Sequence, residues 1–143
     1  MAALLGGPEF RANAPVGVGV NLDAKRPDTY VMGVGQAGLG MPDRDYYLKD
    51  DKKFADTRAK YRAYVEQMLT LASYGDAAAS ADAIVAVERQ IAEIHWPREK
   101  SRNRDLTYNP KSRAELKTFA PDFPWDAGLA AYGIPQQNEF IVV

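Results

Sequence analysis

The chain has 143 residues, of which 46% are hydrophobic and 26% charged, a composition and length typical of one globular domain. Its formal net charge of −1, from 18 basic and 19 acidic residues, provides no basic surplus for phosphates, so nucleic acid is not an expected partner. No apolar run approaches the roughly 20 residues of a transmembrane helix, and the absence of cysteine excludes disulfides, thiolate metal sites and a cysteine nucleophile.

The N-terminal segment MAALLGGPEFRA lacks the basic and apolar regions of a secretory signal. We interpret residues 1–12 as a leader or an artificial extension that frays from the folded part. We expect residues 13–42 to form a β-hairpin and a glycine-rich corner, and residues 43–143 to be helical. The expected fold class is therefore mainly α, with a helical hairpin, shorter helices and a small N-terminal β-hairpin.

The two strands of the β-hairpin are predicted by VGVGVNL at 16–22 and TYVMGV at 29–34, which are rich in β-branched and aromatic residues. The polar segment between them contains Pro27 and suits a turn. Glycine recurs in both segments and weakens them as strands, so we expect the hairpin to pack against another element.

A helical hairpin is predicted for the middle of the chain. Apolar residues at three-, four- and seven-residue spacings predict a first helix over about 51–74, ended by Gly75. A second helix, beginning at Asp76 or Ser80 and extending towards Trp96, has one apolar stripe with its charged residues off that stripe. The stripe consists of Ile84, Val87, Ile91 and Ile94.

Shorter helices follow Pro97, which ends the second helix. The sequence SRAE at 112–115 has the spacing of a capping box and predicts a helix that ends at Pro121. A last helix is predicted over 124–132, ended by Gly133. The final NEFIVV resembles a strand, and its partner lies either in sequence absent from this chain or within the same domain.

Residue counts and spacings exclude several catalytic sites. The chain has 1 histidine, His95, so a zinc site of the His-Glu-x-x-His kind, which needs two histidines, cannot form. His95 lies near a predicted helix C-terminus, where an imidazole can cap carbonyl groups. GVGQAG at 33–38 has the spacing of a dinucleotide fingerprint, but LGMP follows where a helix should begin. No serine lies in a Gly-x-Ser-x-Gly elbow.

The segment GLGMPDRDYYL at 38–48 carries the densest local signals in the chain. We expect Gly38 and Gly40 to permit a turn, and Pro42 with Asp43 to start a short helical segment. These residue types predict a tight corner that leads into the first long helix.

An arginine between two aspartates can fix such a corner, so Arg44 with Asp45 is expected to tie it before Tyr46 and Tyr47 pack. A competing hypothesis is an independent enzyme whose catalytic carboxylates are Asp43 and Asp45 in an open pocket. We assign no residue to catalysis or metal binding. The predicted structural signature consists of Gly38, Gly40, Pro42, Asp43, Arg44, Asp45, Tyr46 and Tyr47.

The order of these features resembles the neprilysin and endothelin-converting-enzyme family of zinc metallopeptidases. The resemblance is carried by GVGVNLDAKRPDTYVMGVGQAGLGMPDRDYYL, YRAYVEQMLTLA, AVERQIAEIHWPREKSRNRDLTYNP and FPWDAGLAAYGI. It covers nearly the whole chain after about residue 13, and its most specific part is 36–48. The absence of cysteine makes the chain more similar to bacterial members than to cysteine-rich animal ectodomains.

This resemblance implies a fragment of a larger two-lobed peptidase. In the family, a mostly helical N-terminal region and a C-terminal catalytic region enclose a central cavity that admits peptides of modest size. The catalytic region holds zinc on two histidines and a glutamate, and another glutamate activates water. None of these residues maps onto this sequence, so the resemblance implies zinc in the parent enzyme and no cofactor in this chain.

The resemblance predicts a non-catalytic N-terminal segment of a zinc-dependent endopeptidase that hydrolyses oligopeptides and helps to enclose the substrate chamber. Its partners would be the C-terminal catalytic region of the same polypeptide and the parent's peptide substrates. The parent would be periplasmic, extracellular or membrane-associated. The alternative is a free-standing helical protein-interaction module without enzymatic activity. An open reading frame that continues past Val143 to a His-Glu-x-x-His helix would distinguish the two.

Overall fold

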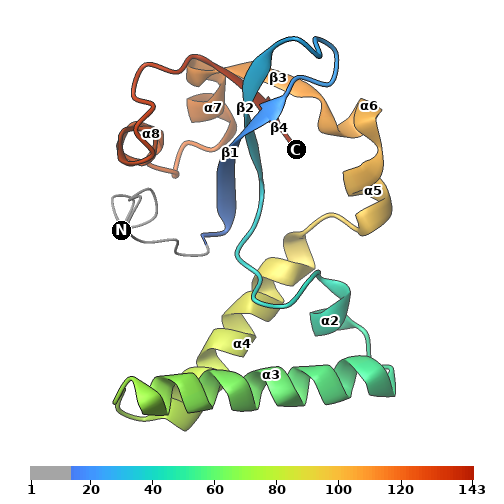
Figure 1. The fold of residues 1–143 in the computed structure, drawn as a ribbon, viewed down its shortest axis with the longest axis vertical. Helices are drawn as coiled ribbons and strands as arrows, with labels where there is room; N and C mark the ends of the chain where they lie inside the picture. The colour runs from blue at the N-terminus through green and yellow to red at the C-terminus, as the bar shows by residue number, and fades with distance from the viewer. Residues whose placement is uncertain (1–13) are drawn as a thin grey trace. The chain divides into compact units, whose positions relative to one another are not determined.

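The computed structural model describes residues 14–143, so the expected leader at 1–12 lies outside the described residues. The chain divides into two compact units (Figure 1). One unit, termed the sheet unit, contains the residues up to Ala37 and those from Glu99 to Val143. The other, termed the helical unit, contains residues 38–98. Helices outnumber strands among the described elements, so the predicted mainly α fold class is confirmed.

The sheet unit contains four strands in the order β1-β2-β4-β3. Strands β1 (Val16–Leu22) and β2 (Tyr30–Gln36) form the predicted antiparallel hairpin. Strand β4 (Glu139–Val142) pairs in parallel with β2, so the C-terminal apolar run finds its partner within the chain. This neighbour also supports the glycine-weakened hairpin, as expected.

Strand β3 (Asn109–Ser112) was not predicted, so the expectation that residues 43–143 are helical is wrong at β3. The C-terminal β4 is the strand that NEFIVV predicted. The residues of β3 show no alternation of apolar and polar types. The strand instead forms by antiparallel pairing with β4, and the Asn109 side-chain amide donates to the Val142 carbonyl at 3.0 Å. Tertiary pairing therefore determines this strand, rather than local propensity.

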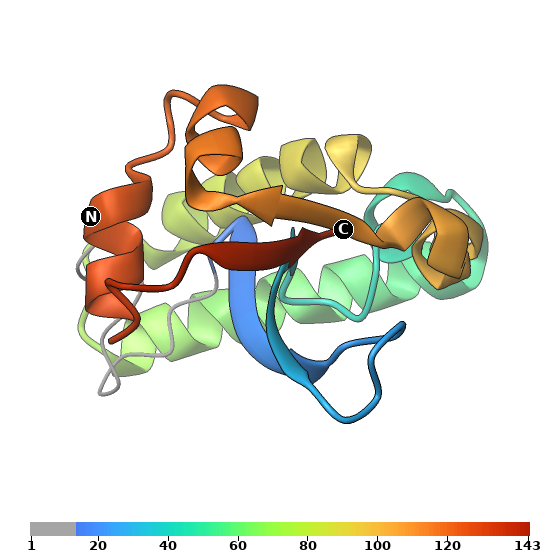
Figure 2. The same ribbon diagram turned by 90° about the horizontal axis from the view of Figure 1, so that it is seen from above.

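The core of the sheet unit lies on one face of the sheet. Val34, Phe140 and Val142 point to this face and pack against two helices, α7 (Arg113–Phe119) and α8 (Trp125–Ala131). The helices contribute Leu116, Trp125 and Leu129. Figures 1 and 2 show α7 and α8 on one side of the sheet, with α6 (Arg104–Thr107) on the other.

Both predicted helix ends in this unit are confirmed. At α7, the Ser112 hydroxyl accepts from the Glu115 backbone N–H at 3.3 Å, and the Glu115 carboxylate accepts from the Ser112 N–H at 2.7 Å, which completes the capping box. At α8, Gly133 has a φ of 75°, and the N–H of Ile134 donates to the Leu129 carbonyl. This bond is that of a Schellman motif, in which glycine suits the left-handed position.

The helical unit contains α2 (Asp45–Leu48), α3 (Lys52–Leu71) and α4 (Ala77–Ile94), with α5 (Arg98–Arg102) beginning at its end. Helices α3 and α4 form the predicted helical hairpin (Figure 1). The predicted apolar stripe of α4 is not the seam of this hairpin. Val87 and Ile94 are 54% and 78% exposed, whereas Ala81 and Ala92 are fully buried.

The turn between α3 and α4 differs from the predicted glycine stop. Ser73, with a φ of 55°, occupies the left-handed position, and Gly75 does not have a positive φ. The Tyr74 N–H donates to the Leu69 carbonyl at 2.9 Å and the Ser73 N–H to the Thr70 carbonyl at 2.9 Å. These bonds form a Schellman motif two residues before the glycine.

Candidate functional site

The corner at 38–48 is built around Tyr47, which is 1% exposed. The Tyr47 hydroxyl accepts from the Met41 backbone N–H at 2.9 Å and donates to a carboxylate oxygen of Glu88 at 2.7 Å. Burial, together with the hydrogen bond to the Glu88 carboxylate, raises the pKa of Tyr47. Tyr47 therefore stays a neutral phenol that links the corner to α4.

Glu88 also accepts a hydrogen bond from α3. The Tyr61 hydroxyl donates to its second carboxylate oxygen at 2.9 Å, and burial with this bond raises the pKa of Tyr61 to about 12. Each oxygen of the Glu88 carboxylate thus accepts one hydrogen bond from a phenol. The arrangement holds α3, α4 and the corner together.

The two glycines of the corner have different physical roles. Gly38 has a φ of 92°, which favours glycine, as expected for a turn. Gly40 has no positive φ, but a Cβ at this position would lie 1.9 Å from the Tyr61 hydroxyl oxygen. Gly40 is therefore required by the close approach of Tyr61, and not by its backbone conformation.

Arg44 does not make the expected pair with its neighbouring aspartates. Its Nε donates to the Ala92 carbonyl in α4 at 3.2 Å. The backbone at Arg44 is helical, with φ −57° and ψ −31°, and consecutive side chains on a helical backbone do not face one another. Arg44 thus ties the corner to α4 through a carbonyl group.

The two aspartates pair with other cations. Asp43 forms an ion pair with Arg98, and its carboxylate accepts from the Asp45 backbone N–H at 2.9 Å. Asp45 pairs with Lys49 at 2.8 Å, one helical turn away. Their side chains are 24% and 40% exposed, so both carboxylates are paired but only partly covered. Such pairing disfavours the competing hypothesis of free catalytic carboxylates.

The remaining signature residues lie before and within α2. Pro42 precedes the first residue of α2 by three positions, so it lies in the bend and not in the helix itself. The Tyr46 ring meets Phe54 edge-on at a centroid distance of 5.1 Å, and its carbonyl accepts from Arg58. The corner is thereby attached to α3 as well as to α4.

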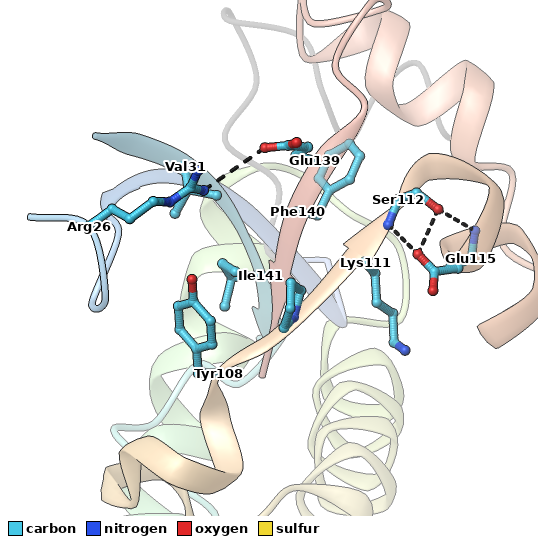
Figure 3. A pocket seen from close by; sticks show the side chains of 10 residues that line it. Arg26, Val31, Tyr108, Lys111, Ser112, Glu115, Glu139, Phe140 and Ile141 are labelled. Carbon is cyan, nitrogen blue, oxygen red and sulfur yellow. Dashed lines mark hydrogen bonds and ion pairs between the residues drawn. The ribbon is translucent and has the colours of Figure 1, made fainter. Parts of the chain in front are cut away.

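The sheet unit contains a cavity of about 290 Å³, shown in Figure 3. It lies over β3 and β4 and is lined by Arg26, Lys111, Glu115 and Glu139 with apolar Val31 and Ile141. The Arg26 guanidinium lies 4.0 Å from Glu139, and Glu115 is engaged in the capping box. The charges of both signs balance, and the lining contains no histidine or cysteine. Sequence patterns missed this cavity because β3 was not predicted.

One rim of this region is fixed by Asp23, which is 2% exposed. Its carboxylate accepts from the Lys25 backbone N–H at 2.9 Å, from Arg26 Nε at 2.9 Å and from the Tyr108 hydroxyl at 3.2 Å. The Lys25 bond, helped by Arg26 and Tyr108 against the effect of burial, lowers the pKa of Asp23 to about 2. Asp23 thus anchors the β1–β2 turn to the segment before β3.

His95 lies at the C-cap of α4, where its backbone N–H donates to the Ile91 carbonyl at 3.2 Å. Within residues 14–143, no group of three or more histidine, cysteine, aspartate or glutamate side chains is placed to hold a metal ion. In the same described range, no helix is long and apolar enough to cross a membrane.

Comparison with known proteins places this chain in a family. The family model described as "Peptidase family M13" matches residues 2–143. Endothelin-converting enzyme 1 of Rattus norvegicus is 34% identical over 140 residues, covering 94% of this chain and 18% of that protein. Human endothelin-converting enzyme-like 1 is 30% identical over 118 residues, covering 81% of this chain and 15% of that protein.

Solved structures resemble the chain throughout. The Mycobacterium tuberculosis zinc metalloprotease Zmp1 in complex with an inhibitor has a TM-score of 0.85 and 35% identity, over 99% of this chain and 22% of that one. The open state of Zmp1 has a TM-score of 0.83 and 36% identity, with the same coverage. The chain thus spans about a fifth of the length of the relatives that it matches.

Proposed function

Since this chain belongs to peptidase family M13 and corresponds to its N-terminal region, we propose that the whole protein is a zinc-dependent endopeptidase. The parent reaction is hydrolysis of internal peptide bonds in oligopeptides. The single observation that carries this proposal is the family match, which extends over residues 2–143. The zinc metalloprotease Zmp1, similar at 35% identity, supports zinc as the parent's metal.

Within this parent, the segment acts as a non-catalytic structural part that helps to enclose the substrate chamber. The contacts of the corner support a structural role, because Tyr47, Tyr61 and Glu88 satisfy one another by hydrogen bonds. The corner residues from Gly38 to Tyr47 position the start of α3 and the end of α4. Chemistry on peptides is left to the C-terminal region of the same polypeptide, its principal partner.

The enclosing role is tested in the full-length parent with a peptide substrate analogue that carries a photoreactive group at one end. After irradiation, cross-linked peptides are identified by mass spectrometry. The proposal expects some cross-links within residues 14–143, and competition by unlabelled substrate should remove them. Cross-links confined to the C-terminal region, from probes labelled at either end, would contradict the enclosing role.

A free-standing interaction module is the second candidate, because large apolar side chains such as Leu71, Val87 and Ile94 are exposed in this chain. The two candidates differ in the gene. A reading frame that continues to a His-Glu-x-x-His helix supports the peptidase, and a native stop after Val143 supports the module. By the family resemblance, the parent acts in the periplasm, outside the cell or at a membrane, which cell fractionation would test.

A further inference from the structure

The α3–α4 hairpin has two unlike sides. On one side, Arg62 of α3 donates through Nε to the Asp82 carboxylate at 2.7 Å and through Nη2 to the Ala78 carbonyl at 3.1 Å. Arg62 also pairs with Glu66 on its own helix. Charged and polar groups therefore close this side of the seam between the two helices.

On α4, the face that forms the seam carries the buried Ala81 and Glu88, which accepts from Tyr61 of α3. Ala92 continues this helical face and is buried with Met41 and Tyr47 of the corner. Residues of the predicted apolar stripe of α4 directly precede residues of that buried face: Val87 precedes Glu88, and Ile91 precedes Ala92. One residue corresponds to a rotation of about 100° around a helix. The stripe therefore faces away from the charged side, and Ile84, Val87 and Ile94 are 37%, 54% and 78% exposed.

Helix α3 presents a similar stripe. Tyr64, Met68 and Leu71 are 57%, 44% and 70% exposed and recur at helical spacing. In an antiparallel helix pair, the residue that directly precedes a seam residue lies on the same side of the pair in both helices. The Arg62–Asp82 pair supports this geometry, since each residue follows a seam residue, Tyr61 or Ala81, and the two meet on the opposite side.

The two stripes together form one surface, which we term the apolar face; it consists of Tyr64, Met68, Leu71, Ile84, Val87, Ile91 and Ile94. We propose that the apolar face binds an amphipathic helix from the remainder of the parent polypeptide. This inference rests on the proposed function, because it requires the longer parent chain. The apolar face would then be the surface through which the parent polypeptide binds the helical unit.

Three observations favour this occupant. The relatives are about five times longer than this chain, so further segments are tethered close by, at an effective concentration on the order of millimolar. The stripe from Ile84 to Ile94 extends about 15 Å, three helical turns, which suits a helix packed along it. Helices α3 and α4 together carry six basic and five acidic residues, so the hairpin has no large basic surplus to attract an anionic lipid surface.

The test measures thiol labelling in the full-length parent. Single cysteines replace Val87 on the apolar face or Ala86, which is exposed on the same helix and points about 100° away from Val87, off that face. Labelling rates are read by peptide mass spectrometry, which separates each site from any native cysteine of the parent. We expect V87C to react at least about tenfold more slowly than A86C in the parent, because labelling at V87C then requires local opening.

The same two variants in the 143-residue chain should react at similar rates, independent of protein concentration. Equal rates in the parent would overturn the proposal, and protection in the short chain that increases with concentration would assign the face to a second copy instead. Peptide hydrolysis by the same parent preparation separates the two inferences. An active zinc peptidase with a freely reactive V87C refutes only the docking proposal, whereas a protected V87C in a parent without peptidase activity refutes only the proposed function.

Discussion

At the scale of single residues, Glu88 is the centre of the helical unit. Its two carboxylate oxygens accept from Tyr47 and Tyr61, and Gly40 leaves the space into which the Tyr61 hydroxyl fits. Sequence patterns assigned Glu88 to the polar side of α4. The spacing from Ala81 to Glu88 to Ala92, seven and then four residues, does place all three on one helical face. A glutamate between two alanines on one helical face was the signal that could have identified the buried side of α4.

Replacing Gly40 by alanine should lower the free energy of unfolding by about 1–3 kcal/mol, because its Cβ would overlap the Tyr61 hydroxyl. Removing that hydroxyl with Tyr61→Phe should offset part of the loss. A double-mutant cycle by urea unfolding should then show a coupling of at least about 0.5 kcal/mol. Strictly additive effects would mean that Gly40 is not required by Tyr61.

Arg44→Ala should lower the free energy of unfolding by about 1–2 kcal/mol, because the Ala92 carbonyl loses a charged donor. Arg89→Ala is a matched control on α4, since its pair with Glu93 is exposed and 3.7 Å long, and it should change stability by about 0.5 kcal/mol or less. Thermal melts of both variants provide the comparison. Equal melting temperatures for the two variants would show that Arg44 does not tie the corner.

At the scale of elements, most helices and the β-hairpin were predictable because their signals are local: spacing, caps and turn residues. The capping box at 112–115 and the stop at Gly133 are such cases. Strand β3 was not predictable, because its pairing with β4 joins segments that are far apart in sequence. The apolar stripe of α4 was predicted from its helical spacing, but this spacing alone does not show which element an apolar face packs against.

The α3–α4 turn predicts a stabilising substitution. Ser73 occupies a left-handed conformation that costs a non-glycine residue energy, so Ser73→Gly should raise the free energy of unfolding by about 0.5–1 kcal/mol. Ser80→Gly, within α4, should lower it by a similar amount because glycine is a poor helix former. If Ser73→Gly lowered the melting temperature as Ser80→Gly does, the Schellman assignment would be wrong.

The β1–β2 turn should confer acid sensitivity through Asp23. Its pKa in the folded state is about 2, below the value of about 3.9 in an unfolded chain. A lowered pKa stabilises the fold above the unfolded value, and that contribution is lost as the pH falls from about 4 through 2. Asp23→Asn should therefore flatten the decline in stability between pH 4 and pH 2, as followed by urea unfolding at each pH. Parallel pH profiles for the two proteins would rule out this role for Asp23.

At the scale of the whole molecule, the candidate site at 38–48 has the contacts of a structural corner. The signature residues from Gly38 to Tyr47 form a corner anchored to α3 and α4, and the family match extends over residues 2–143. From the sequence, only the family resemblance indicates where the catalytic residues of the parent lie. The single histidine excludes a His-Glu-x-x-His zinc site in this chain, but it identifies no other site. The cavity in the sheet unit could not be predicted, because it depends on β3.

The central claim is that this chain is a non-catalytic segment of a zinc-dependent peptidase. The most direct measurement is the zinc content per chain, by elemental mass spectrometry after dialysis, of the purified 143-residue chain beside the full-length parent. We predict about one zinc per parent chain and a negligible amount in the segment alone, because the family resemblance implies that the zinc ligands belong to the C-terminal region. Stoichiometric zinc in the segment, or a parent that binds none, would contradict the account.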